Sequence, residues 1–213
     1  MSWWEYAYRS GDVPWDPGAY DGHLPSVLDR YEISGGTVLD PGCGNGKSAV
    51  WLGEQGFHVT GIDLSSTAIG EARSLARRHA VSGRVEFYEG RFPEEITVGT
   101  EGDPVFRDHR LTLEADSFDL ITERAFLQHL GRGRRSHDTV TLLAKALKPH
   151  GYLYSLMIAS EGTRSYGGIV RWSEKEIRDA LEPRFTIIEM RLDVFTPGEP
   201  GSVPAWLTIG KRR

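Results

Sequence analysis

The sequence has little of three things, and each shortage excludes a class of protein. It contains one cysteine, Cys43, so no disulfide forms within the chain and we expect a reducing compartment. No apolar run approaches membrane-spanning length, and the opening MSWWEYAYRS lacks the apolar core of a secretion signal. Basic residues are outnumbered, 25 against 30, whereas nucleic-acid partners usually require a basic face. We therefore expect a cytoplasmic protein that binds neither membranes nor nucleic acids.

Apolar segments of strand length alternate with segments of helical periodicity along most of the chain. The 213 residues, 39% of them hydrophobic, suffice for one globular domain over 1–213. This alternation predicts a doubly wound α/β sandwich with seven strands. The expected strands are 37–39, 59–62, 84–88, 118–122, 152–158, 185–190 and 203–209, and the expected helices are 21–31, 48–55, 66–80, 136–147 and 173–181.

Two segments interrupt this alternation. Residues 1–20 carry six large aromatic rings among turn residues, which favours either an arm packed on the domain or a lid over a ligand. Residues 93–116 show no helical pattern, so we expect a loop, a hairpin or a flap there. The aromatic residues of the first segment include Trp3, Trp4, Tyr6, Tyr8 and Trp15.

The most informative stretch is 37–65, which reads as strand, glycine turn, helix and strand. The first strand ends at Asp40 and the second at Asp63, and Gly42 and Gly44 lie in the turn between them. In α/β sheets, ligands bind at the carboxyl ends of the strands. A ligand site flanked by two carboxylates is therefore expected at this turn.

Phosphate ligands fit this turn poorly. Its last residues, Gly46, Lys47 and Ser48, match the end of a P-loop, but Pro41 stands where the first glycine belongs and has no N–H to offer. A dinucleotide fingerprint, G-x-G-x-x-G, needs its third glycine where Lys47 stands. Asp40 would also face the pyrophosphate at close range, which is electrostatically unfavourable.

The two carboxylates suit a cationic ligand that carries no phosphate. S-adenosylmethionine is such a ligand, with an ammonium group, a sulfonium and a ribose diol. Asp40 is placed to hold the turn beside the aminoacyl end, and Asp63 is placed to accept both ribose hydroxyls, because an ionised carboxylate accepts two hydrogen bonds strongly. The stretches LDPGCGNG and GIDLS closely resemble the D-x-G-x-G-x-G motif and second acidic strand end of class I S-adenosylmethionine-dependent methyltransferases.

The resemblance extends over nearly the whole chain. WWEYAYRSGDVPWDPG is similar to the W-E-x-x-Y-x-x-G-D-x-P-W-D-x-G segment of the thiopurine, thiol and halide methyltransferase group. ITERAFLQHL resembles that group's fourth-strand segment, with Glu123 in place of an aspartate. HDTVTLLAKALKPHGYLY and AWLTIGKR resemble its later elements. The resemblance implies a Rossmann-like seven-stranded sheet with helices on both faces and an antiparallel last strand.

The resemblance also implies site residues. Glu123 and Arg124 would line the acceptor side as the catalytic candidates, and Trp4, Tyr8 and Trp15 would lie over the cofactor or acceptor. Arg91 departs from the family, because an acidic residue usually accepts from the adenine amine there and arginine cannot accept. No metal ligand is expected. The implied cofactor-binding residues are Trp15, Asp40, Gly42, Cys43, Gly44, Asp63, Leu64, Arg91, Phe92 and Glu123.

The expected function is methyl transfer from S-adenosylmethionine to a small molecule. The motifs place no general base beside the site, which favours a thiol or another soft nucleophile. Two alternatives stay open: methylation of oxygen or nitrogen in a quinone, phenol or natural product, and a non-catalytic protein that binds S-adenosylmethionine for regulation. The oligomeric state stays open as well.

Overall fold

The computed structural model describes all residues except 100–104, 108–109, 162–169 and 200. The chain divides into two compact units, Met1–Arg91 and Phe92–Arg213. A single domain over 1–213 stays a prediction, and each unit is considered by itself below.

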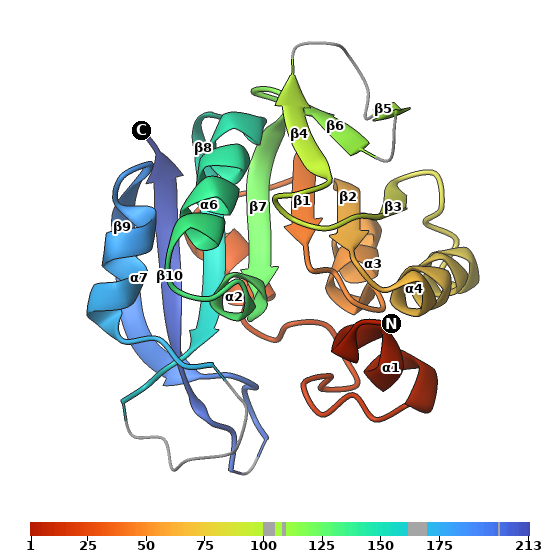
Figure 1. Cartoon of the computed structure of the whole chain (residues 1–213), viewed down its shortest axis with the longest axis horizontal. Helices are drawn as coiled ribbons and strands as arrows, with labels where there is room; N and C mark the ends of the chain where they lie inside the picture. Colours follow the sequence, from red (N-terminus) through yellow and green to blue (C-terminus); the bar gives the residue numbers. More distant parts are fainter. Residues whose placement is uncertain (100–104, 108–109, 162–169, 200) are drawn as a thin grey trace. The chain divides into compact units, whose positions relative to one another are not determined.

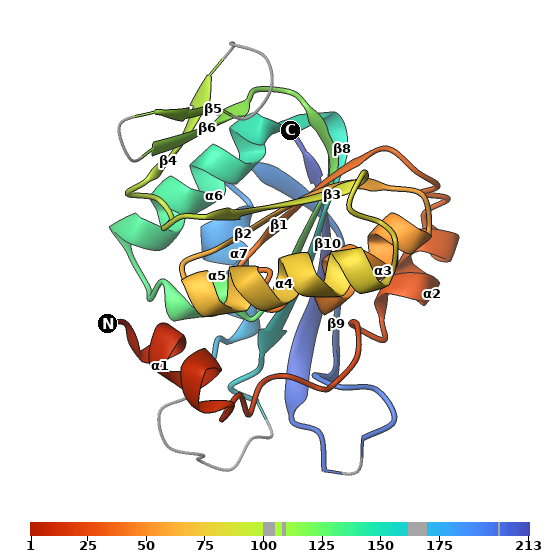
Figure 2. The ribbon, with the colours of Figure 1, turned by 90° about the vertical axis from the view of Figure 1, so that its right-hand side faces the viewer.

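The first unit is built on parallel strands. β1 pairs with β2 and β2 pairs with β3, all parallel, so their carboxyl ends share one edge. Helix α4 packs on β2 and β3, as Figure 2 shows, and α3 also packs on both strands. The elements are α1 (Trp3–Ser10), α2 (Leu24–Arg30), β1 (Thr37–Pro41), α3 (Lys47–Glu54), β2 (His58–Asp63), α4 (Ser66–Arg78) and β3 (Val85–Glu89).

Close packing in this unit explains one glycine of the central turn. A Cβ added at Gly46 would lie 2.7 Å from the Cβ of Ala72 on α4 and 2.8 Å from Cζ of Phe87 on β3. Real Cβ atoms do not approach so closely, so only glycine lets α3 begin here against its neighbours. Helix α4 begins after the next strand, β2, and its first turn is capped by Ser65, whose Oγ accepts from Ala68 N at 3.1 Å.

The second unit contains four strands of the main sheet and a smaller sheet. Its last strand, β10, pairs antiparallel with both β8 and β9, whereas β7 and β8 are parallel. The elements are β4 (Ile96–Gly99), β5 (Val105–Arg107), β6 (Arg110–Glu114), β7 (Phe118–Arg124), α5 (Phe126–His129), α6 (Arg134–Ala146), β8 (Leu147–Ile158), α7 (Glu174–Leu181), β9 (Phe185–Val194) and β10 (Pro204–Arg212).

The main sheet has seven strands in the order β3-β2-β1-β7-β8-β10-β9, with helices around it (Figure 1). This confirms the expected α/β fold with an antiparallel last strand. The segment 93–116 contains β4, β5 and β6, which form a separate sheet in the order β4-β6-β5. β5 and β6 are antiparallel, as a hairpin requires, but the parallel pairing of β4 with β6 was not expected from the sequence. Residues 100–104 and 108–109 of this segment lie outside the described residues.

Candidate active site

The glycine turn of the first unit closes on the end of β2. The amides of Gly42 and Cys43 both donate to the carbonyl of Ile62, at 2.7 and 3.1 Å. Gly44 follows with φ +55°, in the left-handed region that favours glycine. These bonds carry the backbone of the turn across the strand end, so that Gly44 reaches Asp63.

Asp63 is fixed by backbone amides on both carboxylate oxygens. Oδ2 accepts from Gly44 N at 3.0 Å, and Oδ1 accepts from Ser65 N at 2.9 Å. Burial raises the pKa of Asp63, and the hydrogen bonds from Ser65, Gly44 and Leu64 oppose this rise. A carboxylate oxygen accepts more than one hydrogen bond, so both oxygens can also take a hydroxyl. This pair of acceptors fits the ribose diol of S-adenosylmethionine.

Asp40 and Cys43 flank the same turn. Asp40 ends the apolar part of β1 and is buried, with 7% of its surface exposed. Burial raises the pKa of the Cys43 thiol well above its ordinary value, and the nearby Asp40 and Asp63 raise it further. A thiolate nucleophile is therefore disfavoured at Cys43.

The N-terminal aromatic segment reaches the glycine turn through Tyr8. A Cβ at Gly44 would lie only 2.4 Å from Tyr8 Oη, so the phenol sits directly against this glycine. Trp15 Nε1 donates to the same oxygen at 3.2 Å. Trp15 in turn packs edge-on against Trp4, with ring centroids 4.9 Å apart. The structure thus places Tyr8 against the turn, with Trp15 hydrogen-bonded to Tyr8. A lid function of this segment stays a prediction.

Glu5 attaches α1 to α4 and was not identified from the sequence. Its carboxylate accepts from Ser65 Oγ and Thr67 Oγ1, both at 2.7 Å, and from Thr67 N at 3.2 Å. The hydrogen bonds from Ser65 and Thr67 lower the pKa of Glu5 to about 2. Hydroxyl residues at a helix N-terminus accommodate an anion, so the run of Ser65, Ser66 and Thr67 was the available signal.

In the second unit, Glu123 is part of the structural framework. Its side chain is fully buried, and its carboxylate accepts from Ser155 Oγ and from the amides of Phe126 and Leu127, each at 3.1 Å. The two amides belong to the first turn of α5, which therefore begins on this carboxylate. Contact between Glu123 and a cofactor or acceptor stays a prediction, which this geometry does not support.

Replacing Glu123 by alanine should destabilise the protein. The change leaves one hydroxyl and two amides without their acceptor in the core, so we expect the free energy of unfolding to fall by about 3 kcal/mol. Urea denaturation measures this, and Glu174→Ala, which removes a surface partner of Arg178, should cost about 0.5 kcal/mol or less. A fall in turnover at unchanged stability would instead place Glu123 at the acceptor.

Arg124 holds a fixed orientation at the end of β7. Its guanidinium lies 3.7 Å from the ring centroid of Phe195, and Nη2 donates to Phe195 O and to Thr196 Oγ1, each at 3.1 Å. Stacking and hydrogen bonding together hold the cation in one position. Phe92 is buried and packs edge-on against Phe126, with centroids 5.4 Å apart. Arg91 is exposed at the end of the first unit.

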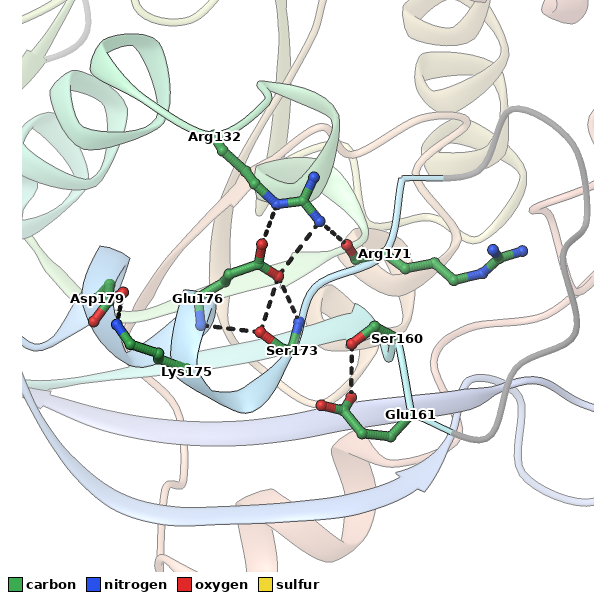
Figure 3. Close-up of polar contacts among 8 residues, drawn as sticks. All are labelled: Arg132, Ser160, Glu161, Arg171, Ser173, Lys175, Glu176 and Asp179. Atoms are coloured by element: carbon green, nitrogen blue, oxygen red, sulfur yellow. Dashed lines mark hydrogen bonds and ion pairs between the residues drawn. The ribbon is translucent and has the colours of Figure 1, made fainter.

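The basic loop after α5 has intrachain partners (Figure 3). Arg132 pairs with Glu176 of α7 and donates to the carbonyl of Arg171 at 2.5 Å. Glu176 also completes a capping box with Ser173. Arg135, in the first turn of the following helix α6, donates to Phe92 O at 3.1 Å. These contacts favour a structural role for the loop over a clamp for an anionic acceptor.

Two other kinds of site are absent from the described residues. Among these residues, no group of three or more His, Cys, Asp or Glu side chains is placed to hold a metal ion. No helix in the described part of the chain is both long and apolar enough to cross a bilayer.

The fold and the glycine turn together define the class of protein to which this chain belongs. A seven-stranded α/β sheet, a glycine turn after one strand and a carboxylate at the end of the next are the features of an S-adenosylmethionine-dependent methyltransferase. Within that class, the chain belongs to the thiopurine S-methyltransferase family, whose family model matches residues 1–201.

The chain is also similar to individual methyltransferases and resembles solved structures in fold. The chain is 26% identical over 180 residues to a probable thiol methyltransferase 2 from Arabidopsis thaliana, which covers 84% of this chain and 71% of the relative. It is 31% identical over 129 residues to a ubiquinone biosynthesis O-methyltransferase from Aromatoleum aromaticum, covering 60% and 46%. The structure of a Burkholderia thailandensis 1,6-didemethyltoxoflavin-N1-methyltransferase, bound to S-adenosylhomocysteine, has a TM-score of 0.73 at 21% identity and covers 97% and 84%. A structure from echinomycin biosynthesis, where a disulfide becomes a thioacetal, has a TM-score of 0.74 at 24% identity and covers 98% and 89%. At these identities the structures show likeness of fold.

Proposed function

We propose that this methyltransferase acts on a small soft nucleophile, with a thiol as the favoured acceptor. The observation that carries the proposal is that, at the end of β7, where we expect the acceptor, Glu123 is buried and hydrogen-bonded while Arg124 is a fixed cation. The Glu123 carboxylate is fully buried and accepts three hydrogen bonds, so it is poorly suited to remove a proton from a substrate. Arg124 is a fixed cation beside it in sequence.

Burial lowers the pKa of His129, at the end of α5, to about 4. A base this weak removes protons inefficiently near neutral pH, because catalysis is best when the pKa of the base lies near the working pH. A thiol needs no such base, since it loses its proton to water before the reaction. S-adenosylmethionine supplies a methyl group that is already activated by its sulfonium. The residues therefore need only align acceptor and methyl group, which contributes roughly 7–11 kcal/mol.

Charge favours an anionic acceptor at Arg124. A guanidinium within a few ångströms of a thiol stabilises the thiolate and lowers the pKa of the thiol. The thiolate sulfur then forms a bond to the methyl carbon while the carbon–sulfonium bond breaks, so one anion and one cation become two neutral products. Similarity to a probable thiol methyltransferase supports the same acceptor class.

A series of thiophenols with different acidities tests the proposal. We expect methylation of every thiol, with kcat/KM rising with pH to a plateau whose midpoint follows the pKa of each acceptor. Arg124→Met should lower kcat/KM by about 10-fold, whereas Arg124→Lys, which keeps the charge, should lose less. Methylation of phenols without any methylation of thiols would overturn the proposal and favour an O-methyltransferase.

A further inference from the structure

Lys47 has no role in the function described so far. It follows the glycine turn where a P-loop would carry its lysine, yet the ligand here has no phosphate. A cation is also unfavourable beside a ligand that carries a sulfonium and an ammonium. The structure shows what engages it: Lys47 Nζ donates to both carboxylate oxygens of Asp16, at 2.7 and 2.5 Å.

Asp16 is bound to the glycine turn at two residues. Besides Lys47, its Oδ2 accepts from Asn45 Nδ2 at 2.8 Å. Its Oδ1 also accepts from Gly18 N at 2.9 Å, which fixes the loop around it. Burial raises the pKa of Asp16, but the hydrogen bonds from Lys47 and Asn45 outweigh it and leave the pKa below its ordinary value. The carboxylate is therefore charged and fully bonded at neutral pH.

These contacts continue to Asp63, the side chain that is expected to bind the cofactor. Trp15, next to Asp16 in the chain, donates to Tyr8 Oη, which lies against Gly44. Gly44 N in turn donates to Asp63 Oδ2. The N-terminal segment thus contacts the turn at Gly44 through Tyr8, and just after it, at Asn45 and Lys47, through Asp16.

We infer that Asp16 is a positioning residue for the cofactor, and that Lys47 and Asn45 hold it. Their contacts fasten the aromatic N-terminal segment to the glycine turn, and cofactor affinity depends on this fastening although neither Asp16 nor Lys47 touches the ligand. The inference rests on cofactor binding at the turn and does not depend on which acceptor is methylated.

Two near-isosteric variants test the inference. Asp16→Asn removes the charge that Lys47 requires, and Lys47→Met keeps the length of the side chain without its ammonium. Each should weaken binding of S-adenosylhomocysteine by about 10-fold in calorimetry, and the double variant should lose no more than a single one, because both remove the same contact. Amide hydrogen exchange in α1 should rise in all three variants, since the segment loses its attachment.

Two control variants separate this role from general stability. Lys47→Arg keeps the cation and should bind S-adenosylhomocysteine nearly as the wild type does. Lys148→Met breaks an ion pair of the same geometry in the second unit, where Nζ donates to both oxygens of Asp119 at 2.8 and 2.9 Å, and should leave the affinity within about 2-fold.

Three results would overturn the inference: unchanged affinity in Asp16→Asn and Lys47→Met, losses that add in the double variant, or an equal loss in Lys148→Met. Failure of the wild-type protein to bind S-adenosylhomocysteine would be a different result, because it would remove the cofactor site itself. Failure of thiol methylation would leave the inference intact, because the calorimetric measurement uses no acceptor.

Discussion

Replacing Asp63 by alanine should weaken S-adenosylhomocysteine binding by about 100-fold or more, as measured by calorimetry. Each hydrogen bond between a hydroxyl and an ionised carboxylate contributes about 1.5–3 kcal/mol, and the diol would lose two. The same change leaves the amides of Gly44 and Ser65 without their acceptor, so the turn itself loosens. Both effects weaken binding of the cofactor.

Asp63→Asn separates charge from shape in this prediction. The amide keeps the size of the carboxylate, but one of its two terminal atoms is now a donor. Because the two oxygens face one amide each, from Gly44 and Ser65, either orientation of the asparagine sets a donor against a donor. We therefore expect Asp63→Asn to bind almost as weakly as Asp63→Ala. Asp29→Ala, on the exposed face of α2, should bind normally. Wild-type affinity in Asp63→Asn would show that the diol is held elsewhere.

The features of the turn that were predictable from sequence depend on local chain geometry. Asp40 and Asp63 lie at the carboxyl ends of adjacent parallel strands, and this spacing is a property of one strand–helix–strand unit. The glycines follow for the same reason, because a positive φ and close packing permit no other residue at Gly44 and Gly46.

The contacts that the sequence did not reveal join residues distant in the chain. Glu5 meets Thr67, and Asp16 meets Lys47, with no periodic pattern linking the partners. Matching a family motif also did not predict whether a side chain of that motif would be buried. Glu123 matches the fourth-strand segment by resemblance, yet in the fold its carboxylate serves the start of α5. A hairpin was among the expectations for 93–116, but the pairing of β4 with β6 was not, because short strands separated by turn residues resemble a loop in composition.

Gly44→Ala should both destabilise the protein and weaken cofactor binding. An alanine at φ +55° costs about 1 kcal/mol in backbone strain, and its Cβ would lie 2.4 Å from Tyr8 Oη. The phenol cannot move freely, because Trp15 Nε1 is bonded to it. We expect the free energy of unfolding to fall by about 2–3 kcal/mol in urea denaturation, and S-adenosylhomocysteine to bind about 10-fold more weakly.

Making Gly44→Ala in a Tyr8→Phe variant separates the cost of the contact with Tyr8 Oη from the cost of the backbone strain. Without the hydroxyl, the nearest remaining ring atom, Cζ, lies 3.5 Å from the added Cβ, an ordinary contact. Gly44→Ala should then cost only the backbone strain, about 1 kcal/mol, so the two changes should be non-additive by about 1–2 kcal/mol. Gly70→Ala is the matched control, because nothing lies within 4 Å of its Cβ in α4, and alanine there should stabilise by up to about 1 kcal/mol. Strict additivity of Gly44→Ala with Tyr8→Phe would mean that the phenol does not rest against the turn, and the predicted lid over the cofactor would then lose its support.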